Sequence, residues 1–90
     1  MKVEFDPEKR AVTLAERGLD FLDAPEIFDG TERTSPDRRF DYPEPRLLTF
    51  GYLQGRLIAV VWTETVSGIR VISMRKANDR EQASFLKHMG

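Results

Sequence analysis

Three cations within one short apolar stretch near the C-terminal end raise the question of what this chain binds. Arg70, Arg75 and Lys76 are interspersed with isoleucine, valine and methionine in GIRVISMRKANDREQ, residues 68–82. The planar guanidinium of arginine donates paired hydrogen bonds that match the oxygens of phosphate and carboxylate groups. Two interpretations follow: the cations are solvent-exposed charges on a strand, or a rigid sheet holds them around an anion.

Strict alternation along this stretch separates the cations. Successive side chains of a strand point to opposite faces, so Arg70 and Lys76 share one face while Ser73 and Arg75 share the other. A β-bulge or the end of the sheet is required to bring them together. We expect Arg70 to contact a substrate or partner from one face, with Arg75 and Lys76 spread around the strand end. Arg46 converges with them if the strands pair as a meander.

Few side chains suit proton transfer. Glu44 lies two residues before Arg46, beside a proline-rich turn, and is a candidate base. Lys76 becomes an acid if neighbouring arginines lower its pKa. Glu81 fits a helix-capping role better than a catalytic one. The only histidine, His88, lies close to the C-terminal end of the chain and is a poor candidate for catalysis.

Several classes of site are missing from the sequence. There are no cysteines, which excludes disulfides and thiolate metal sites. No glycine-rich phosphate loop follows a strand, and no His, Asp and Glu residues have the spacing of metal ligands. One histidine near the end of the chain cannot supply a nucleophile triad. We therefore expect neither a metal nor a cofactor.

Length and charge indicate one small domain with two unlike halves. Ninety residues with 40% apolar content bury about 60–65% of the surface that the unfolded chain exposes, so we expect a single domain, 1–90. Residues 1–44 hold 7 basic and 12 acidic side chains, whereas residues 45–90 hold 7 basic and 3 acidic ones. The basic second half indicates either edge cations that oppose aggregation or a basic face for phosphates.

No segment of the sequence suits a membrane. The longest apolar run, LIAVVW at residues 57–62, is far too short to span a bilayer, and no signal-peptide pattern opens the chain. We expect a soluble, cytoplasmic protein with no membrane partner.

The first half of the chain predicts a short strand and two helices. Lys2–Phe5 alternates apolar and polar residues, as a strand does. Asp6 can cap a helix that follows it, and Gly18 can end that helix. A second helix is expected after Asp20, short or bent because Pro25 removes a backbone donor.

The second half predicts strands and a final helix. The expected strands are Glu32–Ser35 at an edge, Arg46–Leu53, Arg56–Val66 and Gly68–Ala77. Gly55 and Gly68 are expected to take positive φ in two turns, and the apolar run at 57–62 indicates a central strand covered on both faces. Asn78 and Glu81 form a capping box that begins the last helix. The result is an α+β domain: two N-terminal helices packed on an antiparallel β-meander, with a C-terminal helix.

The order of these blocks resembles a known family. VEFDPEKR, AERGLDFLDAPEIF, RFDYPEPRLLTFG, GRLIAVVWTE and IRVISMRKANDREQ cover most of the chain, roughly Val3 to Phe85. Together they resemble the BrnT family of toxins from bacterial type II toxin–antitoxin systems. The last block is the most specific. Its signature positions hold Arg70, Ile72, Ser73, Arg75, Lys76, Ala77, Arg80 and Glu81.

The resemblance implies a fold, an activity and a partner. The fold would be RelE-like, and the activity a metal-independent ribonuclease that arrests translation. The partner would be a BrnA-like antitoxin with a ribbon-helix-helix part, through which alone the complex reaches operator DNA. Two positions depart from the family. Relatives often have Lys-His-Gly where this chain has Glu16-Arg17-Gly18, so an imidazole proton shuttle is missing, and Phe5-Asp6 replaces Trp-Asp.

RNA cleavage without a metal needs the 2′-hydroxyl to attack the adjacent phosphate in line. It requires cations for the developing charge, a base and an acid. The candidate catalytic residues are Arg46, Arg70, Arg75, Lys76 and Glu44. The candidate RNA-binding residues are Ser73, Tyr52, Arg38 and Arg39. An alternative of another class remains open, a non-catalytic RNA- or protein-binding module of the same fold.

Overall fold

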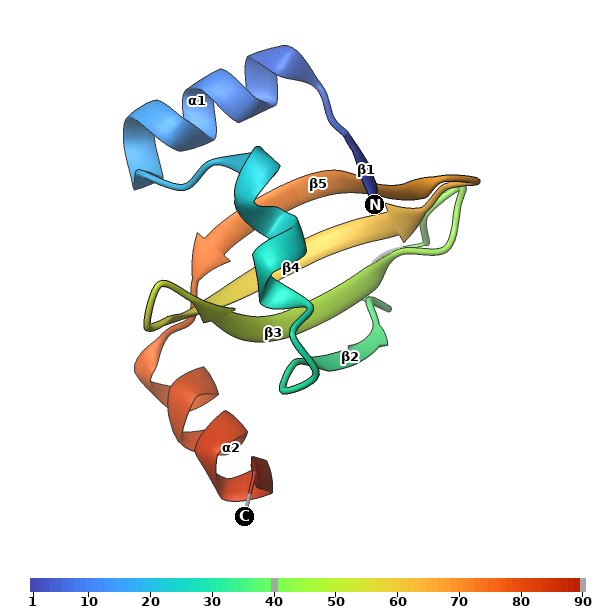
Figure 1. Cartoon of the computed structure of the whole chain (residues 1–90). Coiled ribbons are helices and arrows are strands. Elements are labelled where there is room, and N and C mark those ends of the chain that lie inside the picture. The colour runs from blue at the N-terminus through green and yellow to red at the C-terminus, as the bar shows by residue number, and fades with distance from the viewer. Residues whose placement is uncertain (40, 90) are drawn as a thin grey trace.

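The structure, a computed structural model, describes residues 1–39 and 41–89 of the chain (Figure 1). It is an α+β domain, as predicted, with three helical segments and a five-stranded sheet. The elements in chain order are β1 (Lys2–Glu4), α1 (Pro7–Arg17), the 3₁₀ helix η1 (Phe21–Ile27), β2 (Arg33–Pro36), β3 (Leu47–Leu53), β4 (Arg56–Glu64), β5 (Gly68–Lys76) and α2 (Asp79–Met89).

The sheet has the order β1-β5-β4-β3-β2, which makes β4 the central strand, as predicted. Strands β2 to β5 pair antiparallel as a meander. β1, however, pairs parallel with β5, Lys2 lying opposite Gly68. The sheet is therefore mixed rather than purely antiparallel. Sequence alternation alone cannot reveal which edge a three-residue strand joins, because so short a strand carries little pattern.

Gly55 and Gly68, which were both expected to take positive φ in turns, differ in their backbone conformation. Gly55 takes positive φ (80°), as predicted, and Gln54 before it also has positive φ (52°) in a two-residue hairpin turn. The expectation of positive φ at Gly68 is wrong, since the positive-φ glycines of the described chain are Gly18, Gly30 and Gly55. Gly68 is needed for another reason. A Cβ there would lie 2.0 Å from the carbonyl oxygen of Lys2 in β1.

The N-terminal helices begin and end where their caps direct. Asp6 accepts a hydrogen bond from the backbone N–H of Glu8 (2.9 Å), and Gly18, with φ 69°, closes α1 onto the carbonyl of Leu14. Asp20 caps η1 in the same way, through the N–H of Leu22. Pro25 lies inside η1, which is a 3₁₀ helix and not an α-helix.

The main core lies between η1 and one face of the sheet, called the η1 face below. Figure 1 shows η1 crossing this face, with α1 beside β5. Fully buried side chains on both sides of this contact include Phe21, Ile27, Ile58, Val60 and Met74. Trp62 also belongs to this core, and its indole N–H donates to the hydroxyl of Thr49 (2.7 Å). α1 itself contributes no buried residue.

The opposite face of the sheet, called the α2 face, is covered only in part. Phe85 of α2 packs with Leu57 and Ala77, and its ring meets Tyr52 edge to face at 5.5 Å. α2 begins with the predicted capping box: Asn78 and Glu81 exchange backbone-to-side-chain hydrogen bonds of 2.8 and 2.9 Å. Figure 1 shows α2 projecting beyond the end of the sheet. Much of this face is therefore not covered by a helix, and its own side chains form the surface there.

Candidate functional site

A β-bulge in β5 brings two of the predicted cations to one face. Ser73 lies opposite Val61, but Val71 lies opposite the next residue, Trp62, so Ile72 is the extra residue in the register. Arg70 pairs with Thr63 and Arg75 pairs with Ala59, two positions on the α2 face. The bulge that strict alternation demanded is therefore present.

Lys76 does not join this group. It pairs with Ile58, whose side chain belongs to the core of the η1 face. The exposed ammonium lies beside a hollow that Asp20, Asp23 and Arg56 also line. The predicted convergence of all four cations is therefore wrong for Lys76, because it follows Arg75 directly and the strand turns its side chain the other way.

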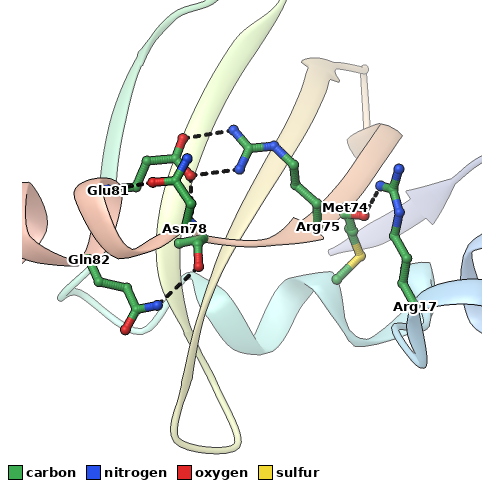
Figure 2. Close-up of polar contacts among 7 residues, drawn as sticks. Arg17, Met74, Arg75, Asn78, Glu81 and Gln82 are labelled. Atoms are coloured by element: carbon green, nitrogen blue, oxygen red, sulfur yellow. Dashed lines mark hydrogen bonds and ion pairs between the residues drawn. The ribbon is translucent and has the colours of Figure 1, made fainter.

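Arg75 forms a two-pronged ion pair with the first turn of α2. Its Nη1 and Nη2 donate to the two carboxylate oxygens of Glu81 at 2.7 and 2.8 Å (Figure 2). These hydrogen bonds are the main reason that the pKa of Glu81 falls to about 2, and they raise the pKa of Arg75. Glu81 thus stays ionised near neutral pH, and it joins β5 to α2 while also capping the helix at Asn78.

The loop between β2 and β3 carries a second ion pair. Asp37 has a buried carboxylate (side chain 1% exposed) that accepts from Nε and Nη2 of Arg39 at 2.9 and 3.0 Å. The hydrogen bonds from Arg39 are the main cause that lowers the pKa of Asp37 to about 2, and the Tyr42 hydroxyl donates to the same carboxylate (3.3 Å). The charge of Arg39 adds a small effect on the Arg75–Glu81 pair: it helps to lower the pKa of Glu81, and it opposes the rise that Glu81 causes in the pKa of Arg75. The charges of the loop and those of β5 and α2 therefore influence one another.

Arg46 lies at the base of the same loop. Its guanidinium is 4.1 Å from the centroid of the Tyr42 ring, and its contact with Glu44 is long, 3.4 Å. The Arg46 carbonyl accepts from the N–H of Asp37 (2.8 Å). The Thr63 hydroxyl donates to the carbonyl of Pro45 (2.7 Å), which fixes the loop to β4 next to the strand position of Arg70.

An open hollow of about 700 Å³ lies along this loop, lined by Pro36 to Arg39 and Asp41 to Arg46. Arg38 and Arg39 therefore border the same space as Arg46 and Glu44. Arg70 is exposed on the neighbouring strand and forms no salt bridge within the described chain. The cations of the α2 face thus fall into two sets: Arg39 and Arg75 are paired with carboxylates, whereas Arg70 is unpaired and Arg46 is weakly paired.

The remaining candidates lie at the margins of this arrangement. Ser73 is half-buried opposite Val61 and lines a groove between α1 and β5. Tyr52 packs against Phe85, so its ring serves the contact between α2 and the sheet. His88 is exposed near the end of α2, with Nδ1 2.7 Å from the carbonyl of Ser84.

Two polar residues of this region have roles that were not anticipated. Arg17 stands where the resemblance expects histidine, and its Nη1 donates to the carbonyl of Met74 at 2.8 Å (Figure 2). Because β1 covers only Gly68 to Arg70 of β5, that carbonyl lies on an edge that β1 does not pair. Asp37 organises the loop. The Asp-x-Arg spacing of residues 37–39 was its only sequence signal.

Two absences can be stated for the described residues. Among them, no group of three or more His, Cys, Asp and Glu side chains is placed to hold a metal ion. No helix in the same part of the chain is long and apolar enough to cross a membrane.

Fold and site together describe a small α+β domain in which several arginines lie on one sheet face and along its adjoining loop, an arrangement suited to anions such as phosphate. The family model for the ribonuclease toxin BrnT of type II toxin–antitoxin systems matches residues 5–81. The chain belongs to this family. No curated protein matches the chain.

Proposed function

We propose that this chain is the toxin of a type II toxin–antitoxin system, an endoribonuclease with a RelE-like fold that cleaves cytoplasmic RNA without a metal and so inhibits translation. A BrnA-like ribbon-helix-helix antitoxin neutralises it and carries the complex to operator DNA. The family assignment supports the class. The arrangement of cations on the α2 face supports the chemistry.

The reaction requires a phosphate held beside its own 2′-hydroxyl. Arg70 and Arg46 bind the phosphate oxygens, since neither is held by a short ion pair. The 2′-oxygen forms a bond to phosphorus, and the bond to the 5′-oxygen breaks. The Glu44 carboxylate takes the hydroxyl proton, a water protonates the leaving oxygen, and the hydroxide so formed takes the proton back from Glu44, which leaves a 2′,3′-cyclic phosphate and a 5′-hydroxyl. The cations stabilise the charge on the phosphate in the transition state.

The paired arginines have a different role in this proposal. Each is neutralised by a carboxylate, Arg75 by Glu81 and Arg39 by Asp37, and Arg75 binds RNA when a phosphate replaces Glu81. Arg38 and Ser73 contact the flanking backbone. Tyr52 contributes through the packing of α2, and Lys76, on the η1 face, takes no part.

The single observation that carries this proposal is the bulge at Ile72. Without it, Arg70 and Arg75 would occupy opposite faces of the sheet, and the backbone of a single RNA strand could not contact both. With it, both lie on the face that adjoins the loop of Arg39 and Arg46.

The test is incubation of purified protein with RNA in EDTA. Cleavage by the wild type, and its loss in Arg46→Ala and Arg70→Ala variants that fold normally, is the expected result. Arg56→Ala is the matched control, because Arg56 is an exposed arginine in the hairpin at the far end of β4 and should leave cleavage unchanged. Cleavage that depends on added metal, or that persists in both variants, contradicts the proposal.

A second candidate is a non-catalytic binding module of the same fold. The ion pairs of Arg75 and Arg39 favour it, because they leave fewer cations for a transition state, and so does Arg17 in place of histidine. The same assay separates the two candidates. RNA that is bound at high protein concentration but stays uncut supports the module.

A further inference from the structure

A small groove lies between α2 and the α2 face of the sheet, outside the candidate catalytic residues. It holds about 310 Å³, and most of the surface that it offers to a ligand is apolar. Phe50 of β3 and Phe85 of α2 line its floor, and Ser84 lines its wall. The groove exists because Phe85 is the one side chain of α2 that is buried among those the structure describes, while the small side chain of Ser84 leaves the space beside it empty.

The rim of this groove is cationic. Arg33 of β2 and Arg80 of α2 line it, together with His88. The guanidinium of Arg33 donates to the carbonyl of His88, which ties the two walls together. Glu81 is the one acid of the lining, and it is already bound to Arg75. The net charge offered to a ligand is therefore positive, although the whole chain carries a net charge of −1.

An apolar floor with a cationic rim fits one kind of occupant. Apolar side chains gain free energy when they leave water for the floor, and carboxylates complement Arg33 and Arg80. RNA fits less well. Phe85 is 5% exposed and meets Tyr52 edge to face, so it offers no ring face for base stacking.

We propose that this groove receives an acidic, amphipathic segment of the antitoxin, with its apolar side chains over Phe50 and Phe85. The inference rests on the proposed function for the existence of that partner. Glu81 lines the groove and also binds Arg75. A segment seated there lies against the cations of the α2 face and excludes RNA from them, so the groove gives inhibition a location next to the phosphate site.

Filling the groove tests the proposal. Ser84→Trp places an indole in it from an exposed position of α2, and Ala83→Trp, also exposed, is the matched control. The probe is a purified BrnA-like ribbon-helix-helix protein, the partner class named in the proposed function, titrated by calorimetry into each folded variant. We expect Ser84→Trp to bind it at least about tenfold more weakly and Ala83→Trp to bind it like the wild type, as for a contact at the centre of an interface.

The charge on the rim is tested in parallel. Arg80→Glu should weaken antitoxin binding severalfold. Lys87→Glu makes the same change of charge on α2 outside the lining of the groove and should not. In the RNA assay, Ser84→Trp should cleave like the wild type and resist neutralisation by the antitoxin.

Three results overturn the inference. Unchanged antitoxin affinity in Ser84→Trp means that the partner docks elsewhere. If Ser84→Trp loses RNA binding but keeps antitoxin binding, RNA is the occupant of the groove. If the wild type sediments as a dimer and Ser84→Trp as a monomer, the occupant of the groove is a second copy of the chain. If the wild type does not cleave RNA, the proposed function fails, but the calorimetric comparison still decides whether the groove binds the partner.

Discussion

Glu81 both caps α2 and forms an ion pair with Arg75, and a single substitution separates the two interactions. Its carboxylate caps Asn78 and binds Arg75. Glu81→Gln keeps a capping side chain but removes the charge that holds the guanidinium. We expect the free energy of unfolding to fall by about 1 kcal/mol, because the pair is partly exposed, and RNA affinity to rise as Arg75 becomes available to phosphate.

Fluorescence anisotropy with labelled RNA and denaturant titration measure the two effects. Glu64→Gln, an exposed glutamate at the end of β4, is the control and should change neither. Weaker RNA binding in Glu81→Gln would mean that Glu81 positions Arg75 for RNA and does not compete with it.

Stability depends on acid pH because four carboxyl groups of the described chain have lowered pKa values, those of Asp20, Asp29, Asp37 and Glu81. The pKa of Asp37 and that of Glu81 are each lowered to about 2, mainly by hydrogen bonds from Arg39 and Arg75 respectively. A carboxyl group whose pKa is lower in the folded state stabilises the fold above its unfolded pKa and loses that contribution as protons bind. Stability should therefore fall as the pH drops from about 4.5 towards 2.

Denaturant midpoints at several pH values measure this loss. Asp37→Asn should make the profile shallower over that window, because only the contribution of Glu81 and the other carboxyl groups remains, and it should lower stability at pH 7, because Arg39 loses its anionic partner. Asp41→Asn, an exposed aspartate of the same loop, should follow the wild-type profile. A wild-type stability that does not change between pH 5 and about 2 would contradict the linkage.

The sequence was enough to predict which residues the site contains, but not which residue each of them contacts. Arg70, Arg75 and Arg46 stand out because arginine in or beside an apolar strand has few structural uses. That Arg75 would already hold Glu81 depends on where α2 points after the capping box, which residue spacing does not specify. Arg17 was noted for the histidine that it replaces, yet its contact with Met74 needs the position of β5.

At the scale of elements, the tight contact of β1 with β5 predicts a steric requirement at Gly68. A Cβ there would lie 2.0 Å from the Lys2 carbonyl oxygen and 2.6 Å from the Lys2 nitrogen, both backbone atoms that cannot rotate away. Gly68→Ala should displace β1 and lower the free energy of unfolding by about 2 kcal/mol or more. Thermal melts measure the loss.

The control for that substitution is the preceding residue. Ser67→Ala changes an exposed side chain in the same turn and should melt within about 1 °C of the wild type. A wild-type melting temperature in Gly68→Ala would mean that β1 does not press against β5 as described.

The elements that the sequence predicted well are those set by local chemistry. Asp6, Gly18 and the Asn78–Glu81 box act within one helical turn, so their residue types determine the helix ends. The bulge at Ile72 arises in the pairing of β5 with β4, and the parallel pairing of β1 is a contact between distant segments. Such contacts leave no periodic signal, and they decide which face each cation occupies.

At the scale of the whole molecule, the cations of the α2 face predict a moderate dependence of RNA binding on salt. Binding that neutralises about three or four phosphates should give a slope of about −2 to −3 in log K against log salt for a single strand. Arg70→Ala should reduce that slope by about 0.7. Lys76→Ala, on the η1 face, should leave it unchanged. Equal slopes for all three proteins would exclude Arg70 from the RNA contact.

The pairing of β1 with β5 also ties completion of the sheet to a late step in the synthesis of the chain. Lys2 to Glu4 are synthesised more than sixty residues before their hydrogen-bonding partners, Gly68 to Arg70. Long-range pairing of this kind closes late in folding. Arg70 and Arg75 lie on the strand that carries these partners, so a nascent chain has no sheet face that holds both arginines until β5 has been made and has paired with β4.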